Sequence, residues 1–205
     1  MNFKLTVLVI SLLSLAACSK KIVPVEGYQF ISNEKNIGEI EDIDLAKSIN
    51  LSSFRPQDLQ LNLADSVIRY NETFVSNYKI FKFKATPSKK YRIIVYSYCD
   101  CWGLKKYLFD PNIKIIDENR ELVLFRLVSY DFNPNNAPLF YRKEWMTEQE
   151  MTGNCYIILY SNNSKLQENI ATIIADVYTG MSTVPVPVPI NIKSSLVGDF
   201  RIILQ

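Results

Sequence analysis

Four cysteines are the most reactive side chains of this chain, and the sequence contains no histidine. Without an imidazole, the Ser-His-Asp and Cys-His forms of nucleophilic catalysis, the common zinc-hydrolase sites and the usual pH switch are excluded. The carboxylates are scattered along the chain, so the facing pair that a glycosidase requires cannot be assigned. We therefore expect a protein that is not an enzyme and needs no cofactor, with a hydrolase as the weakest alternative.

Cys18 ends the sequence Leu15-Ala16-Ala17-Cys18, which follows a short basic start and an apolar run that begins at Leu5. This order of charged, apolar and small residues is typical of a secretory signal, and its last four residues match the bacterial lipobox. The apolar run is too short to cross ~30 Å of hydrocarbon as a helix. We expect cleavage after Ala17 and lipid on Cys18, as in the lipoprotein precursors that this segment resembles. An ordinary signal peptide is the alternative.

The remaining chain has the length of one domain. Removing residues 1–17 from the 205 leaves 188 residues, a usual size for a single core. Residues 18–44 show no sustained periodicity and contain an acidic cluster, which predicts a solvated, lipid-anchored tether. Residues 45–205 would then form the folded domain.

Charge gives little indication of a partner. After loss of Lys4, 22 of the 23 basic residues remain against 21 acidic residues, and no block of like charge stands out. We therefore expect no nucleic-acid partner. Membrane attachment would come from the lipid on Cys18. Ser19 follows that cysteine where an Asp would favour retention in the inner membrane, so we expect the outer membrane, with the domain facing the periplasm.

The three other cysteines, Cys99, Cys101 and Cys155, are disulfide candidates in an oxidising compartment. On a strand, the Cα atoms of Cys99 and Cys101 would lie ~6.7 Å apart, at the edge of disulfide reach. We therefore expect Cys155 to pair with one of them. A three-thiolate metal site is the alternative, but no convincing fourth ligand is present, and no metal is expected.

Strand patterns dominate after residue 50. Alternating or β-branched and aromatic segments predict strands at residues 79–85, 91–99, 112–116, 122–128, 154–160 and 200–204. The third and fourth of these are separated by a tight connection that predicts a hairpin. Residues 165–175 have apolar residues at helical spacing, and residues 184–189 must be extended because they alternate with proline. The prediction is a mainly β, β-sandwich or jelly-roll-like single domain with one or two short helices.

An ordered series of short motifs runs through this region, at Ser52–Pro56, Tyr78–Phe83, Ile93–Tyr98, Phe109–Asp117, Tyr156–Tyr160 and Ser194–Ile202. With these motifs the chain resembles the maltose-operon periplasmic protein family, most closely where Phe109–Asp117 follows that family's F-x-P-x-V-x-x-L-D pattern. The resemblance covers over half of the mature chain and implies a periplasmic, β-rich protein without a known catalytic site. The chain departs from the pattern at Cys99–Trp102 and in its lipid anchor.

Aromatic side chains are the candidate ligand-binding groups. Exposed aromatic faces stack on sugar rings, whereas buried ones fill a core, and we name four candidates: Trp102, Tyr98, Tyr107 and Trp145. Trp102 is the most exposed candidate because its segment, which ends at Lys106, has the composition of a loop. The leading function is a non-catalytic binding or accessory module, whose ligand is a glycan or an envelope protein. The alternative is a structural or assembly partner of an envelope or secretion complex.

Overall fold

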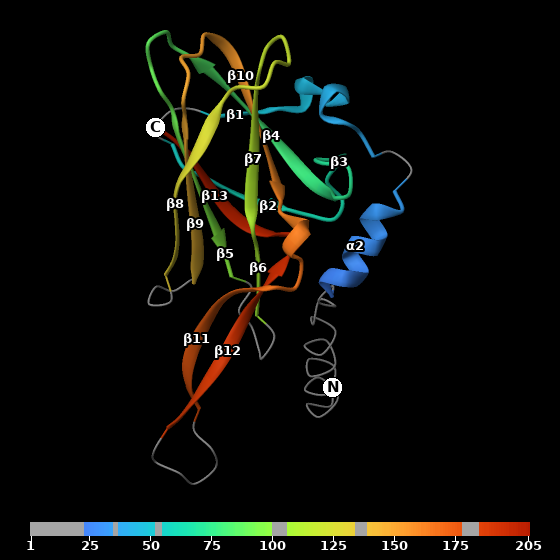
Figure 1. The fold of residues 1–205 in the computed structure, drawn as a ribbon, viewed down its shortest axis with the longest axis vertical. Helices are drawn as coiled ribbons and strands as arrows, with labels where there is room; N and C mark the ends of the chain where they lie inside the picture. The colour runs from blue at the N-terminus through green and yellow to red at the C-terminus, as the bar shows by residue number, and fades with distance from the viewer. Residues whose placement is uncertain (1–22, 35–36, 52–54, 100–105, 134–138, 178–184) are drawn as a thin grey trace, which may run out of the picture.

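The fold is described from a computed structural model over residues 23–34, 37–51, 55–99, 106–133, 139–177 and 185–205. It is mainly β, as predicted: two sheets pack face to face, and a two-stranded ribbon projects from the lower end of the molecule (Figure 1). No helix in the described ranges is both long enough and apolar enough to span a membrane.

The first sheet, here called the β10 sheet, has the order β1-β4-β10-β7, and β3 pairs with β4 outside this order. β1 joins in parallel, and the other pairs are antiparallel. Its strands are β1 (Ile49–Asn50), β3 (Val67–Arg69), β4 (Val75–Ala85), β7 (Pro111–Asp117) and β10 (Gly153–Ser161).

The second sheet, the β5 sheet, is antiparallel throughout and has the order β2-β13-β5-β9-β8. Its strands are β2 (Gln57–Leu61), β5 (Arg92–Tyr98), β8 (Phe125–Asn133), β9 (Phe140–Thr147) and β13 (Gly198–Leu204). The expected hairpin of residues 112–116 and 122–128 is therefore wrong as a pairing of two full strands. β7 and β8 lie in different sheets, and the antiparallel contact of β7 is with the connection before β8, at the bridge between Ile116 and Leu122.

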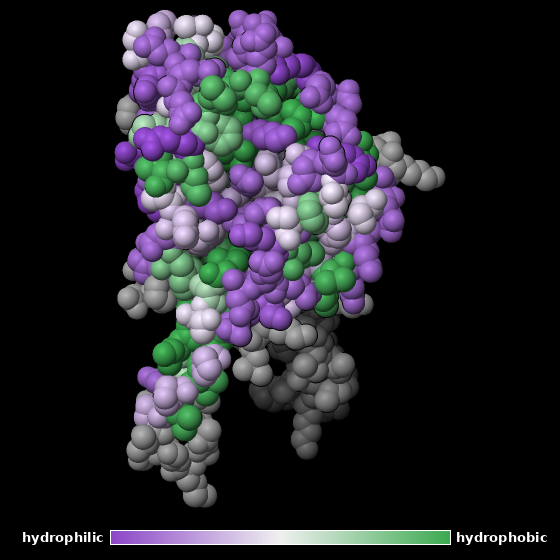
Figure 2. Space-filling view, viewed as in Figure 1, coloured by the Kyte–Doolittle hydropathy of each residue, from purple (hydrophilic) through white to green (hydrophobic). Residues whose placement is uncertain are grey.

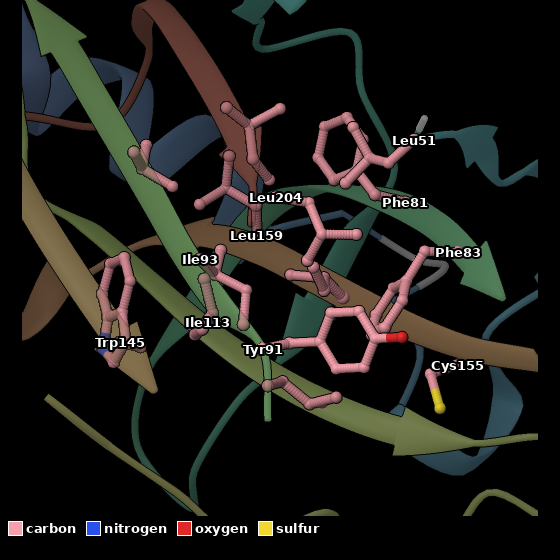
Figure 3. Packing of buried hydrophobic residues seen from close by; sticks show 14 of the residues in the cluster. Leu51, Phe81, Phe83, Tyr91, Ile93, Ile113, Trp145, Cys155, Leu159 and Leu204 are labelled. Carbon is pink, nitrogen blue, oxygen red and sulfur yellow. The ribbon is translucent and has the colours of Figure 1, made fainter. Parts of the chain in front are cut away.

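The main core lies between these two sheets. Along β4, Phe81, Phe83 and Ala85 are buried as the alternation predicts, and they face residues of β5 and β13 such as Ile93 and Phe200. Figure 3 shows this packing from close by. Phe81 and Phe200 meet edge to face, with ring centroids 6.1 Å apart, a geometry that aromatic pairs prefer.

The outer face of the β10 sheet is also covered, by the segment that precedes β1. Ile43 is 2% exposed and joins a second cluster with Ile80 and Ile158. This segment contains the short helices η1 (Ile40–Asp42) and η2 (Leu45–Lys47). Both faces of the sheet are thus buried, which explains why β10 is apolar on both sides.

Helix α2 (Pro24–Ser32) departs from the expectation of a solvated tether up to residue 44. Pro24 stands at the start of the helix, where proline is tolerated, and Ile31 is fully buried against Val67 and Val75. Short-range patterning missed this because the apolar residues of the helix do not share one face: Ile31 is buried, whereas Val25 and Phe30 are exposed. The described part of residues 24–44 is packed onto the domain.

The third sheet has the order β11-β12-β6, formed by β11 (Asn169–Val177), β12 (Val186–Ser195) and β6 (Lys106–Phe109). The expected helix at residues 165–175 is wrong, because only η3 (Asn163–Lys165) precedes β11. Ile170, Thr172, Ile173 and Ile174 are β-branched and favour a strand once a partner is available. The proline-rich residues that were expected to be extended supply that partner, as β12.

Two of the connections between the third sheet and the sandwich are very short. Asp110 is the single residue between β6 and β7, and Leu196 and Val197 separate β12 from β13. Gly198 begins β13 in close contact with Phe109, because an added Cβ would lie 3.3 Å from Phe109 Cδ1. The ribbon of β11 and β12 is therefore fixed to the sandwich at its base.

Candidate functional site

The outer face of the β5 sheet brings polar and aromatic side chains together from β2, β13, β5 and β9. In β13, Phe200 and Ile202 are buried in the core, so the alternating residues Asp199 and Arg201 point outward. The same alternation defines what we call the polar-aromatic face: Asp58, Gln60, Tyr96, Tyr98, Phe140, Arg142, Asp199 and Arg201.

The register of all five strands of the β5 sheet aligns a row of charged and aromatic residues across this face. Arg201 is opposite Asp58 on one side and Tyr96 on the other. Tyr96 is in turn opposite Arg142, which is opposite Asp131. Cross-strand neighbours of this kind lie about 4.5–5.5 Å apart at Cβ, so the row presents a tyrosine between two cations and a carboxylate at each end.

Asp58 and Arg201 form a bidentate pair. Arg201 Nε lies 2.6 Å from Asp58 Oδ1, and Nη2 donates to Oδ2 at 2.7 Å. This hydrogen bond from Arg201 lowers the pKa of Asp58, and the same bond raises the pKa of Arg201. Both groups therefore stay charged at neutral pH and hold each other in one orientation.

An open hollow of about 670 Å³ lies over this pair, lined by Asp58, Leu59, Gln60, Tyr98, Asp199, Phe200 and Arg201. Tyr98 is half-buried, and desolvation raises its pKa, so its hydroxyl is neutral at physiological pH. Beside it, Tyr96 packs edge to face on Phe140 with ring centroids 5.3 Å apart. The hollow thus combines an aromatic side chain with two carboxylates, an amide and a guanidinium.

A buried carboxylate on the same side of β9 holds Arg142 in place. Glu144 is 4% exposed, and its Oε1 lies 3.0 Å from Arg92 Nε while Oε2 pairs with Arg142. A carboxylate this buried requires such partners. The pairing fixes Arg142, so the cation beside Tyr96 does not move freely.

The four aromatic residues expected to bind ligand lie in different parts of the molecule. Tyr98 lines the hollow, whereas Trp102 lies outside the described residues. Tyr107 is on β6, opposite Lys193 of β12, and does not belong to the polar-aromatic face. The assignment of Trp145 to a binding platform is wrong: it is 3% exposed and packs in the main core (Figure 3).

The expected disulfide through Cys155 is also wrong, since Cys155 is a free and fully buried thiol. It lies opposite Phe83, near the end where β4 leads into β5, whereas Cys99 follows the far end of β5. A seven-residue strand separates these two ends by roughly 20 Å. Cys99 is disulfide-bonded, and Cys18 and Cys101 lie outside the described residues.

Burial also controls the chemistry of Cys155. Desolvation raises the pKa of its thiol to about 11, with smaller contributions from Asp117 and Glu118. A thiol at this pKa carries little thiolate at neutral pH and is a poor nucleophile or metal ligand. Within the described ranges, no three Cys, Asp or Glu side chains are grouped so that they could hold a metal ion.

Exposed apolar side chains form a second candidate surface, the β8 edge, defined as residues 122–130. Its large exposed members are Leu122, Leu124, Leu127, Val128 and Tyr130. β8 is the last strand of its sheet, and its pairing with β9 shifts register between Leu127 and Ser129. Figure 2 shows hydrophobic side chains gathered toward the upper end of the sandwich, where β7 and β8 are connected.

Comparison with protein-family models, with curated proteins and with solved structures finds no match to this chain. The geometry described above therefore provides the basis for the function proposed next. Sequence patterns identified Tyr98 but missed Asp58 and Arg201, because the two lie 143 residues apart. The alternation of each strand predicts that both side chains point outward, but only the order of the strands in the sheet shows that they pair.

Proposed function

We propose that the protein is a non-catalytic lipoprotein of the bacterial envelope, anchored by acyl chains on Cys18, whose β-sandwich binds a glycan on the polar-aromatic face. The observation that carries the proposal is the hollow in which Tyr98 lies beside the Asp58–Arg201 pair. A tyrosine ring packs on the apolar face of a sugar, while oriented carboxylate, amide and guanidinium groups hydrogen-bond its hydroxyls. Sites of this kind join apolar surface to a few placed polar groups.

Binding is tested with Tyr98→Ala and a panel of oligosaccharides, by calorimetry and by the change in melting temperature. Loss of a central aromatic contact weakens binding about tenfold or more. Tyr130→Ala is the matched control, because Tyr130 is 68% exposed and lies on the β8 edge. If the panel contains no ligand, or if both variants bind like the parent, the glycan proposal is wrong.

The anchor is tested separately. Mass spectrometry of the mature protein should find acyl groups on Cys18, and membrane fractionation should release the Cys18→Ser variant from the membrane. A Cys18→Ser protein that is processed and retained like the parent would contradict the anchor. The proposed location is the outer membrane, with the domain facing the periplasm, and membrane separation on a density gradient checks it.

A second candidate function is that of an assembly partner in an envelope complex, which the β8 edge favours. Leu124 is 63% exposed in that segment, and an edge strand with exposed apolar residues is a usual site for pairing with another chain. A photo-crosslinker at Leu124 in cells should then give one defined adduct, which Leu127→Asp abolishes. Recovery of the uncrosslinked monomer alone contradicts this function. The relation to the maltose-operon periplasmic proteins stays a prediction.

A further inference from the structure

The ribbon of β11 and β12 extends away from the sandwich, and its outer part has an unusual composition. β6 pairs with β12 only from Ile192 to Ser195, so the outer part comprises residues 170–176 and 186–191. Asp176 is its single charged residue, and Thr172 and Asn191 are its only other polar ones. Figure 1 shows this ribbon beyond the lower end of the body. A projecting segment would ordinarily be polar, so its apolar composition requires an explanation.

One face of the ribbon is entirely aliphatic. The register places Ile173 opposite Ile190 and Ala175 opposite Val188, so the face consists of Ala171, Ile173, Ala175, Val186, Val188 and Ile190. The opposite face holds all three polar residues, and the hydrogen bond from Thr172 Oγ1 to Asn191 Oδ1 at 2.9 Å marks it. Val186 and Val188 are 47% and 37% exposed. The opposite face also carries Ile174, which is 74% exposed, so the two faces differ in that only the aliphatic face lacks polar side chains.

Two prolines remove backbone hydrogen-bond donors from β12. Pro187 and Pro189 are opposite Asp176 and Ile174 in the ladder with β11. In an antiparallel strand, the backbone N–H groups point alternately toward the partner strand and away from it, and proline is tolerated only where its missing N–H would point away. The edge of β12 that faces away from β11 therefore lacks the N–H donors of Pro187 and Pro189. This disfavours pairing with a protein strand and lowers the cost of moving the edge out of bulk water.

Helix α2 begins at the ribbon end of the molecule, which places the proposed lipid anchor at the same end. Pro24 follows Cys18 by six residues, and six residues reach at most about 20 Å. Figure 1 shows that α2 begins at the end of the molecule from which the ribbon projects. Acyl chains on Cys18 would therefore enter a leaflet close to that end.

We infer that the aliphatic face of the β11–β12 ribbon is a membrane-contact surface that rests on the leaflet holding the acyl chains of Cys18. The inference relies on the anchor proposed above. The N–H and C=O groups on the open edge of β11 keep the ribbon in the headgroup and upper acyl region, because hydrocarbon does not solvate them. Anchor and ribbon then give the domain two attachment points and one orientation.

The test places a fluorophore on each face of the ribbon in the full lipidated protein, reconstituted into phosphatidylethanolamine–phosphatidylglycerol vesicles. Val188→Cys carries a nitrobenzoxadiazole label on the aliphatic face, and Asn191→Cys carries it on the polar face. The native Cys155 is buried and does not take the label. We expect a blue-shifted emission at position 188 that shallow nitroxide lipids quench several-fold more strongly than the emission at position 191.

The outcomes separate the anchor from the ribbon. If the labelled protein does not float with the vesicles, the anchor fails and the ribbon inference fails with it. If the protein floats but the two labels are quenched equally, the ribbon inference alone is overturned. A position-188 label that is shielded in cell envelopes but not in lipid vesicles would mean that a protein covers this face, and it would also overturn the inference. Val186→Asp, introduced into the protein labelled at Val188→Cys, should lose the shielding without loss of folding, as measured by circular dichroism, because Val186 lies on the same face and is 47% exposed.

Discussion

Lys143→Met is the substitution whose cost follows most directly from this structure. Lys143 lies on β9, and its ammonium pairs with Asp110, the residue that joins β6 to β7. The two side chains are 12% and 10% exposed. Lys143 Nζ also donates to the carbonyl of Pro111 at 3.1 Å, and Asn162 Nδ2 donates to Asp110 Oδ2 at 3.1 Å. The pair thus connects the β5 sheet to the place where the chain passes from the third sheet to the β10 sheet.

Methionine fills nearly the same volume but leaves the Asp110 carboxylate without its counter-ion. Removing one member of a buried pair typically costs about 3–5 kcal/mol, whereas replacing both members by neutral groups is often close to neutral. Because both side chains keep some solvent contact, we take the lower end, about 3 kcal/mol. For a domain of this size, that corresponds to a fall in melting temperature of about 6–12 °C.

Urea denaturation followed by circular dichroism measures the effect, in a cycle of Lys143→Met, Asp110→Asn and the double variant. The double variant should recover at least half of the loss, because it removes the unpaired charge. Arg126→Met is the control: Arg126 and Glu148 are 63% and 48% exposed, and such pairs contribute little. A Lys143→Met protein within about 0.5 kcal/mol of the parent, or single losses that simply add, would refute the reasoning.

Three further predictions concern other parts of the fold. Burial raises the pKa of Cys155 to about 11 and of Tyr70 to about 12, from ordinary values of 9.0 and 10.0. The unfolded chain therefore releases these protons first, so stability is full below pH 9 and falls between about pH 9 and 12; a urea midpoint that is level or rising to pH 11 would contradict this. Gly198→Ala should cost about 1–3 kcal/mol by denaturation, because its Cβ would lie 3.3 Å from the buried Phe109 ring. Gly38→Ala is the control, with its nearest atom 4.0 Å away, and equal effects at the two glycines would show that the contact is unimportant. Iodoacetamide at pH 8 should modify Cys155 only after addition of urea, and rapid modification of the native protein, seen by mass spectrometry, would contradict the buried thiol.

The strands of the sandwich are the part of the fold that local patterns predict best. Residues 79–85 and 154–160 fall within β4 and β10 because each carries a face of large β-forming residues that must be buried. The pairing is not local. The tight connection between β7 and β8 has the composition of a hairpin turn, yet β7 pairs with β10 and β8 with β9. Burial of both faces of the β10 sheet decides this arrangement, and that information is spread over the whole chain.

Residues 165–175 show how one spacing supports two structures. Ile170, Ile173 and Ile174 recur at the spacing of a helix face, but in β11 Ile173 lies on the aliphatic face and Ile174 on the opposite one. A helix would have buried all three on one side of the domain. With β12 beside them as an extended partner, the β-branched side chains keep their preferred conformation in a strand.

Candidate site residues were predictable where one strand determines them. Tyr98 and Trp145 are both aromatic candidates on predicted or observed strands, but Tyr98 lines the outer hollow, whereas Trp145 on β9 faces the opposite way, into the core. Choosing between the two requires knowing which face of the β5 sheet meets the β10 sheet. Asp58 and Arg201 require in addition the register between β2 and β13, so no local pattern could have paired them.

The folded N-terminal segment of the domain limits how far the binding face can lie from the lipid anchor. A solvated tether over residues 18–44 would let the domain rotate freely above the lipid. Instead α2 begins at Pro24 and packs on the sandwich, so with lipid on Cys18 only five residues, 19–23, would separate the lipidated cysteine from the helix. With the proposed ribbon contact as a second attachment, a chain this short would restrict rotation of the domain about two points. The polar-aromatic face would then meet ligands that lie close to the membrane surface, and a longer linker inserted after Cys18 should weaken capture of membrane-associated glycan without changing the affinity for the same glycan in solution.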